Sequence, residues 1–281
     1  MSLSVEAIGA AATLQDGGRP GHRRYGVPVG GAFDRESYEL GNALVGNGPA
    51  AAALELTVTG GRFRADGRHR VAVVGAKLEL SVNGFPLRQQ TPVDLAPGDV
   101  LALGTMHGGA RSYLCVGGGF LGEPILGSLS GIPVRKGDSL LVGPQSVTPA
   151  VEGPATPLAS LRPRALRLLR GPQFALFRSR DFAQETYEVS PHCNRAGIRL
   201  TGPPMDVPAE APSEPMCVGA VQITRDGMPV VIGPDGPTIG GYPKIACLIE
   251  ADLDRLGQLL PGDTVRFEWA HAPARAFRDP R

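Results

Sequence analysis

Residues 77–103 read KLELSVNGFPLRQQTPVDLAPGDVLAL. The first six residues alternate polar and apolar side chains, which is typical of a half-buried β-strand. Asn83-Gly84 follows and is typical of a tight hairpin turn, after which Pro86–Val93 is expected to form a second strand. A Pro97-Gly98 turn leads to a third expected strand at Asp99–Leu103. The stretch therefore predicts consecutive β-strands joined by tight turns.

The rest of the chain continues this pattern. Further strands are expected at Arg111–Val116 and Arg164–Arg170, whereas helical spacing is confined to Asp34–Val45 and Ala251–Leu260. Asp34 is suited to cap the start of its helix. Because strands are not regularly alternated with helices, the sequence predicts a mainly β protein with a few short helices, best described as two β-barrel domains.

A Pro- and Ala-rich stretch at Pro144–Pro163 lacks periodicity and is interpreted as a linker. It divides the chain into an N-terminal domain, residues 1–150, and a C-terminal domain, residues 164–281. A Gly-Asp turn before a strand occurs in both, at Gly98-Asp99 and at Gly262-Asp263, with a weaker copy at Gly137-Asp138.

Composition excludes several classes of protein. The 281 residues carry a net charge of +1 and no basic stripe, so nucleic-acid binding has no electrostatic support. Neither a signal peptide nor an apolar run of about 18 residues is visible, so we expect a cytoplasmic protein without a membrane partner. The four cysteines form no Cys-x-x-Cys pair and are expected to be buried thiols rather than zinc ligands.

Polar side chains gather on a tight loop near the N-terminus. Gln15, Asp16 and Arg19 lie within the loop TLQDGGRPG, residues 13–21. An arginine fork can bind a carboxylate or phosphate, and a glutamine can read an amide, so the loop is a candidate site. The alternative is an ion pair between Asp16 and Arg19 that only stabilises the loop.

The next polar residues are more ambiguous. Asp34 is either a helix cap or a binding residue, and Asn42 lies on the same expected helix. Asn47 precedes Gly48 and is expected in a turn. Glu55 lies in the apolar run AALELT, where a carboxylate needs a partner or a cleft.

The C-terminal half contains the richest candidate, GPDGPTIGGYPK at residues 233–244. Its glycines would let backbone N–H groups approach a ligand closely, although a rigid β-turn explains the segment equally well. It lacks the Gly-Lys-Ser/Thr of a P-loop. The chemistry-bearing residues of this run are Asp235, Thr238, Gly240, Gly241, Tyr242 and Lys244.

Two arginines, Arg195 and Arg199, are spaced so that they either flank an anion or remain solvated. The sequence offers no Gly-x-Ser-x-Gly elbow and no His-Glu-x-x-His pattern, so neither a serine nucleophile nor a metal site is predicted.

Many short motifs resemble, in order and spacing, those of the KipA family, which includes the C-type (PxpC) component of bacterial 5-oxoprolinase, proteins named allophanate hydrolase subunit 2 and the carboxyltransferase part of urea amidolyases. The resemblance covers nearly the whole chain. Its motifs are TLQDGGRPGHRRYGVPVGGAFD (13–34), ELGNALVGN (39–47), AALELT (52–57), RSYLCVGGGF (111–120), ILGS (125–128), LLRGPQ (168–173), NRAGIRLTG (194–202), PSEPMCVGAVQIT (212–224), IGPDGPTIGGYPKIA (232–246) and LGQLLPGDTVRF (256–267).

This resemblance implies a cyclophilin-like fold of two β-barrel domains. It also implies ATP-dependent opening of 5-oxoproline to glutamate, together with a KipI-like (PxpB-type) subunit and a PxpA-like (LamB/YcsF) subunit. ATP would be used by the whole complex, and this chain alone would be inactive or weak. The alternatives are a biotin-dependent carboxyltransferase that uses carboxybiotin and acts on urea or another small amide, and a non-catalytic KipA-type regulator that binds a KipI-like partner.

The expected site residues follow from the clusters and the resemblance together. Asp16, Arg19, Asp235 and Lys244 are predicted to be catalytic. The predicted substrate-binding residues are Gln15, Asp34, Asn42, Glu55, Arg195, Gln222, Thr238, Gly240, Gly241 and Tyr242.

The chain departs from the family's pattern in two places. The loop at Leu129–Arg135 is shorter than in the family, and Pro237 and Ile239 replace the usual Gln and second Thr. If the loop helps to close the site, its loss of length would alter the activity.

Overall fold

The computed structural model describes residues 1–144, 165–177, 182–208 and 212–270. The expected linker at Pro144–Pro163 lies, after its first residue, outside the described residues. The chain divides into two compact units. The first contains Met1–Arg23, Val29–Arg162 and Gly257–Leu259, and the second contains Arg24–Pro28, Pro163–Leu256 and Leu260–Arg281.

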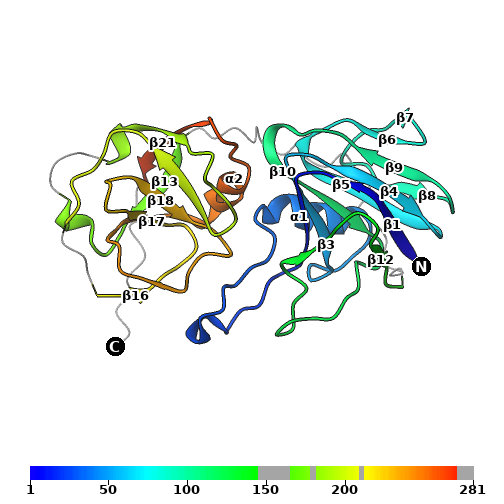
Figure 1. Ribbon diagram of the computed structural model, residues 1–281, viewed down its shortest axis with the longest axis horizontal. Helices are drawn as coiled ribbons and strands as arrows, with labels where there is room; N and C mark the ends of the chain where they lie inside the picture. Colours follow the sequence, from blue (N-terminus) through cyan, green and yellow to red (C-terminus); the bar gives the residue numbers. More distant parts are fainter. Residues whose placement is uncertain (145–164, 178–181, 209–211, 271–281) are drawn as a thin grey trace. The chain divides into compact units, whose positions relative to one another are not determined.

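The first unit contains two six-stranded sheets (Figure 1). One has the order β12 (Ser139–Leu141), β1 (Ser2–Ile8), β4 (Gly61–Ala65), β9 (Val100–Leu103), β6 (Leu80–Val82) and β7 (Phe85–Pro86). The other has the order β11 (Ile132–Pro133), β2 (Ala11–Gln15), β3 (Ala53–Thr57), β10 (His107–Val116), β5 (His69–Lys77) and β8 (Val93–Leu95). All the pairings within the two sheets are antiparallel.

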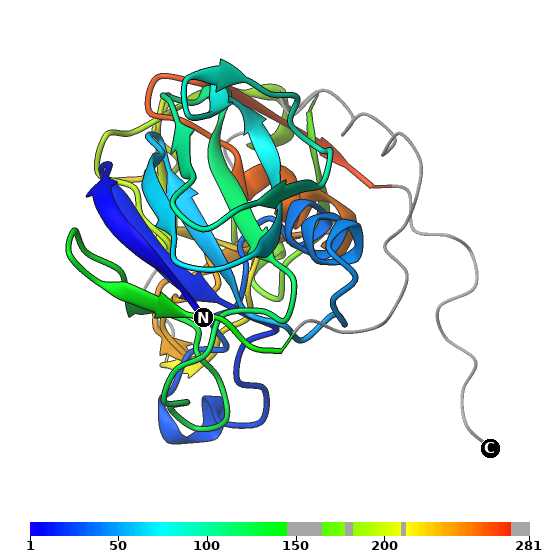
Figure 2. The same ribbon diagram turned by 90° about the vertical axis from the view of Figure 1, so that its right-hand side faces the viewer.

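The two faces of the second sheet bury different clusters. Leu54 of β3 and Leu114 of β10 face a core shared with the other sheet, which supplies Phe63 and Leu101 among others. Their neighbours along the strands point the opposite way, as the period of two requires, and Tyr113 joins the cluster under helix α1 (Arg35–Leu44). The helix lies against this sheet in both views (Figures 1 and 2). The sheet is therefore covered on both faces.

The second unit is built around a closed seven-stranded barrel. Strand β13 closes it by pairing antiparallel with β20 and parallel with β21. The barrel order is β13 (Leu166–Arg170), β20 (Lys244–Leu248), β17 (Ala220–Ile223), β18 (Pro229–Ile232), β15 (Gly197–Thr201), β14 (Thr186–Val189) and β21 (Thr264–Trp269). The short strands β16 (Glu214–Pro215) and β19 (Ile239–Gly240) form a separate pair. The prediction of a mainly β protein is thus confirmed.

Helices are few and short in the described residues. Helix α1 is confirmed, and Asp34 is its N-cap, because its carboxylate accepts from the Ser37 amide. The helix expected at Ala251–Leu260 is shorter than predicted. It consists of the 3-10 turn η4 (Glu250–Asp252) and α2 (Leu253–Gly257). The other 3-10 turns are η1 (Arg23–Tyr25), η2 (Phe174–Leu176) and η3 (Phe182–Gln184).

The strands predicted from residues 77–103 are present with shifted limits. Asn83-Gly84 forms the β6–β7 turn, and both residues have the positive φ angles (52° and 84°) that this pair tolerates. The strand expected at 77–82 is divided, because β5 ends at Lys77 and β6 begins at Leu80. The strand expected at Pro86–Val93 was wrong over Leu87–Pro92, where β7 has already ended and β8 has not begun.

The Gly-Asp turn recurs with one geometry. Gly98, Gly137 and Gly262 all have φ near +90°, and the aspartate that follows each glycine accepts from a backbone amide three residues before that aspartate, at 2.8–2.9 Å. Among the residues described, no helix combines the length and the hydrophobicity needed to cross a membrane.

Candidate functional site

The first unit holds the predicted loop residues against a second loop, Ser128–Ser130. The Asp16 carboxylate accepts from Ser128 Oγ at 2.6 Å and from the Leu129 amide at 2.7 Å. Arg19 donates to the carbonyl oxygens of Ser130 (2.5 Å) and Ile125 (3.2 Å). Asp16 and Arg19 therefore both bind the second loop, and no ion pair between them is seen in the described residues.

Gln15 belongs to the same cluster. Its Oε1 accepts from Ser130 Oγ at 2.6 Å, and the same hydroxyl accepts from the Gly31 amide at 2.6 Å. The loop that is shorter than in the family is thus fastened to the three residues predicted for the site. Sequence reasoning missed Ser128 and Ser130, although two serines beside Gly127 and Gly131 are a usable loop signal.

Beneath helix α1 lies a buried polar network around Glu55, which is 1% exposed. One carboxylate oxygen accepts from the Tyr113 hydroxyl at 2.7 Å and from the Phe33 amide at 3.1 Å. The other accepts from Arg111 Nε at 3.3 Å. The guanidinium of Arg111 also lies 4.5 Å from the centre of the Phe33 ring and donates to the Gly257 carbonyl. Glu55 therefore has the partners that a buried carboxylate requires.

Asp34 occupies the other end of this network. Its carboxylate accepts from Ser37 and from Gln258 Nε2, and its amide donates to the Tyr113 hydroxyl. Burial raises the pKa of Asp34 above the ordinary aspartate value, although these hydrogen bonds oppose the shift. Burial also raises the pKa of Tyr113, so the phenol stays protonated and donates to Glu55.

Asn42 lies elsewhere on α1. Its amide donates to the Ala51 carbonyl at 3.0 Å and accepts from Asn47 at 2.8 Å. Asn47 also binds the backbone of Val116 and Gly118, which fits the expected turn role. Asn42, Asp34 and Glu55 are all 1% exposed and bonded to protein groups. A role for them in substrate binding stays a prediction.

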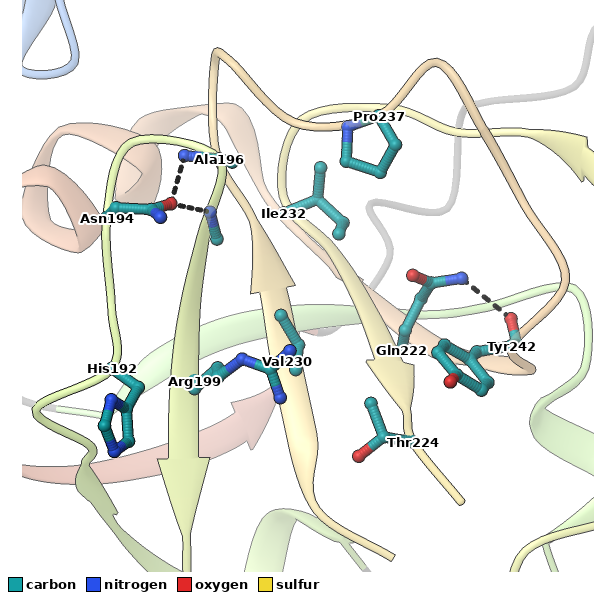
Figure 3. A pocket seen from close by; sticks show the side chains of 11 residues that line it. His192, Asn194, Ala196, Arg199, Gln222, Thr224, Val230, Ile232, Pro237 and Tyr242 are labelled. Atoms are coloured by element: carbon teal, nitrogen blue, oxygen red, sulfur yellow. Dashed lines mark hydrogen bonds between the residues drawn. The ribbon is translucent and has the colours of Figure 1, made fainter. Parts of the chain in front are cut away.

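The second unit contains a pocket of about 260 Å³ (Figure 3). Alternation along the strands explains its position. Ile198, Val221 and Val231 fill the barrel interior, so their neighbours on β15, β17 and β18 face outward. The pocket is therefore on the outer face of the barrel. Its lining consists of His192, Asn194, Ala196, Gly197, Arg199, Gln222, Thr224, Val230, Ile232, Pro237 and Tyr242.

The polar groups of this pocket come from different segments. Gln222 on β17 donates from Nε2 to the Tyr242 carbonyl at 2.9 Å, which fixes the direction of its amide (Figure 3). Arg199 on β15 is exposed and lies between His192 and Val230 in the same view. No aspartate or glutamate is among the lining residues of this described pocket. Its charge therefore suits a small anionic or neutral polar ligand.

The remaining predicted residues of the second unit are engaged in ion pairs near this pocket. Arg195 binds both carboxylate oxygens of Asp235, at 2.8 and 3.0 Å. Lys244 Nζ lies 2.8 Å from Glu214 and donates to the Pro215 carbonyl. The hydrogen bond from Lys244 lowers the pKa of Glu214. The structure thus gives Arg195 and Arg199 different surroundings, because one pairs with Asp235 and the other lines the pocket.

The Gly-rich run does not form a phosphate cradle in this structure. The amides of Gly233, Asp235 and Gly236 donate to backbone carbonyl oxygens of Ala196, Arg195 and Gly233. Thr238 is buried, and its carbonyl accepts from the Met216 amide at 2.9 Å. Gly240 pairs with Glu214 between β19 and β16, and Gly241 follows it. In the described ranges, no three His, Cys, Asp or Glu side chains are grouped to hold a metal ion.

The chain matches the family model described as "Carboxyltransferase domain, subdomain A and B" over residues 25–269. It is 33% identical to the C-type component of 5-oxoprolinase from Escherichia coli (strain K12), with 94% of this chain and 90% of that protein covered. It is 32% identical to urea amidolyase of Lachancea kluyveri, with 95% of this chain but only 17% of that protein covered.

A solved structure agrees with these matches. The urea carboxylase of Kluyveromyces lactis superposes with a TM-score of 0.84 at 30% identity, over 95% of this chain and 27% of that one. Fold, motifs and site thus define a two-unit carboxyltransferase-type domain. The chain belongs to the family of carboxyltransferase domains, subdomains A and B.

Proposed function

We propose that this chain is one component of a complex that opens 5-oxoproline to glutamate in an ATP-dependent reaction. The observation that carries the proposal is the pocket on the outer face of the barrel, where Arg199, the Gln222 amide and the apolar Val230 face one space. 5-Oxoproline presents a carboxylate, a lactam and ring methylenes. Each of these groups has a matching wall in this pocket.

In this proposal Arg199 balances the substrate carboxylate, because a guanidinium matches carboxylate geometry. The Gln222 amide, held by the Tyr242 carbonyl, is oriented to read the lactam. Val230 and Ile232 form the apolar side. The pocket is slightly smaller than most drug-sized ligand sites, which favours a small molecule.

The similarity to relatives supports a role within such a complex. The match to the 5-oxoprolinase component of Escherichia coli covers 90% of that protein, whereas the match to urea amidolyase covers 17%. Because the amides of the Gly-rich run are occupied by the chain's own carbonyls, we assign ATP to the assembled complex with KipI/PxpB-like and PxpA-like partners.

The description of the matching family as a carboxyltransferase domain favours one second candidate. In it, carboxybiotin carried by another polypeptide would supply a carboxyl group to urea or another small amide in the same pocket. Urea has no carboxylate, so its binding would not depend on Arg199. This difference separates the two candidates.

The test is co-expression of the full chain with its partner subunits, followed by measurement of ATP-dependent glutamate release from 5-oxoproline. Arg199→Gln should raise the KM by about 10- to 100-fold, the loss expected for one charge-assisted hydrogen bond. The matched control is Arg266→Gln, which changes an exposed arginine of β21 outside the pocket. Absence of glutamate release from an assembled wild-type complex would sink the proposal.

A further inference from the structure

Two cysteines meet on the second unit. The Sγ atoms of Cys217 and Cys247 are 3.6 Å apart, and neither cysteine is in a disulfide. Cys217 immediately precedes the turn into β17, and Cys247 lies on β20. These two strands pair, with Ala220 opposite Cys247. The contact is therefore fixed by the backbone of the barrel.

The geometry is close to that of a bonded pair. A disulfide has an S–S distance of about 2.05 Å, so the two sulfur atoms must approach by roughly 1.5 Å. Rotation of the exposed Cys217 side chain moves its sulfur with little disturbance of the packing, because Cys217 lies outside the regular strands. Cys247 Sγ also contacts the Val218 carbonyl at 3.9 Å, so both sulfur atoms lie at the same turn.

The two thiols have different surroundings. The hydrogen bond with Cys217, together with partial burial, raises the pKa of Cys247, so this thiol stays protonated. Cys217 is the exposed sulfur that a reagent in solution meets first. Cys115 provides the contrast within the chain, because it is fully buried and burial raises its pKa. Reactivity therefore concentrates on Cys217.

We propose that Cys217 and Cys247 are a reversible oxidation site that a peroxide closes into a disulfide. In the first step Cys217 sulfur attacks one peroxide oxygen, the O–O bond breaks, and sulfenic acid and one water (for hydrogen peroxide) are formed. In the second step Cys247 sulfur displaces that hydroxyl as a second water while the S–S bond forms. Two thiols lose two electrons in total, and the peroxide gains them.

The disulfide would fasten the segment that borders the pocket. Residues 214–217 contain Glu214, which pairs with Lys244, and Met216, whose amide donates to the Thr238 carbonyl. The same segment leads into β17, which carries Gln222. Oxidation therefore joins this segment covalently to β20 beside the candidate site, and we expect slower amide hydrogen exchange at Met216 and Gly219 in the oxidised chain.

The test treats the full chain with hydrogen peroxide, denatures it and counts its thiols with a maleimide. The chain has four cysteines, so the reduced protein should bind four maleimides and the oxidised protein two. Dithiothreitol should restore four. Peptide mapping should find the Cys217–Cys247 cross-link.

Matched variants locate the pair. Cys217→Ser and Cys247→Ser should each form no intramolecular disulfide among the three remaining thiols after treatment, whereas Cys193→Ser should still lose two thiols. The proposal is overturned if Cys217 is oxidised to sulfinic acid without a cross-link. It is also overturned if the treated chain forms only intermolecular dimers through Cys217, or if all four thiols survive.

Discussion

The side-chain amide of Gln258 donates to the Asp34 carboxylate at 2.5 Å, although the two residues are 224 positions apart in the sequence. Both belong to the first unit, because Gly257–Leu259 is grouped with it. Gln258 also donates to the Arg111 carbonyl and accepts from the Arg111 amide, both at 3.0 Å. One buried glutamine therefore joins the cap of α1, strand β10 and the residues that follow α2.

Replacing Gln258 by leucine should lower the free energy of unfolding by about 3 kcal/mol, because the buried Asp34 carboxylate and the Arg111 backbone lose partners. Chemical denaturation measures the change. Gln258→Glu is the informative companion, because it places a second carboxylate beside Asp34.

The pKa of Asp34 is already raised by burial, and a neighbouring negative charge would raise it further. The folded state of Gln258→Glu should therefore bind a proton more tightly than the unfolded state does. Its deficit in stability should shrink as pH falls toward the raised pKa. A deficit that does not change with pH would contradict this view of the network.

The ion pair between Arg111 and Glu55 should show the asymmetry of buried charges. Arg111→Met leaves the 1% exposed Glu55 carboxylate without its cation and should cost about 3–5 kcal/mol. The double variant Arg111→Met, Glu55→Leu removes both charges and should recover part of that loss. Urea unfolding of the two variants decides between them, and a double variant less stable than the single one would exclude the charge-based explanation.

The acid limb of the stability curve should depend on Asp66. Hydrogen bonds from the Ser2 hydroxyl and amide lower the Asp66 pKa from 3.8 to about 2. A carboxyl group with a lowered folded-state pKa contributes stability above its unfolded pKa and loses it as pH falls through the folded one. Asp66→Asn should therefore flatten the stability change between pH 3.8 and about 2.

The control for this measurement is Asp94→Asn. It removes an exposed carboxylate that lies 4.0 Å from Arg70 and leaves Ser2 untouched. An unchanged slope in Asp66→Asn, measured by denaturant midpoints across that window, would show that the two Ser2 hydrogen bonds do not govern the acid limb.

The Gly-Asp turns should be sensitive to conformation alone. A Cβ built on Gly262 meets nothing within 4 Å, but its φ of +86° lies in the left-handed region. Gly262→Ala should therefore destabilise the chain by about 1–2 kcal/mol without any steric clash. Gly48 is the matched control, since its Cβ also meets nothing and its φ is not in that region. Thermal unfolding of Gly262→Ala and Gly48→Ala should separate the two, and equal melting temperatures would refute the argument.

Gln222 should matter for binding more than for folding. Its amide is held by the Tyr242 carbonyl at the edge of the pocket. In the 5-oxoprolinase assay Gln222→Leu should raise the KM by about tenfold, the cost of one hydrogen bond to substrate. Thr201→Val is a control, because Thr201 follows Arg199 on the same strand but does not line the pocket. A similar KM change in both variants would speak against a direct contact.

Short-range signals predicted the local structure well. Asn83-Gly84 specifies a turn whatever surrounds it, and Asp34 caps the helix that its own neighbours form. Limits were missed where neighbours in space decide. Leu87–Pro92 was expected to be a strand, but the pairings of β7 with β6 and β8 with β5 set where each strand begins and ends.

The candidate site was predicted in part. Gln222 and Tyr242 line the pocket, and Gln15, Asp16 and Arg19 do share one cluster. His192, Asn194 and Thr224 were missed, because no sequence pattern says which exposed side chains of neighbouring strands meet around one space.

The sequence by itself determined the class of fold and the family, because strand alternation, turn pairs and ordered motifs are properties of consecutive residues. Only the tertiary structure decided which side chains meet. Glu55 found Arg111 and Tyr113, Gln258 found Asp34, and Cys217 found Cys247. Such contacts depend on strand register and on how distant segments pack, and neither is encoded in the spacing of residues along the chain.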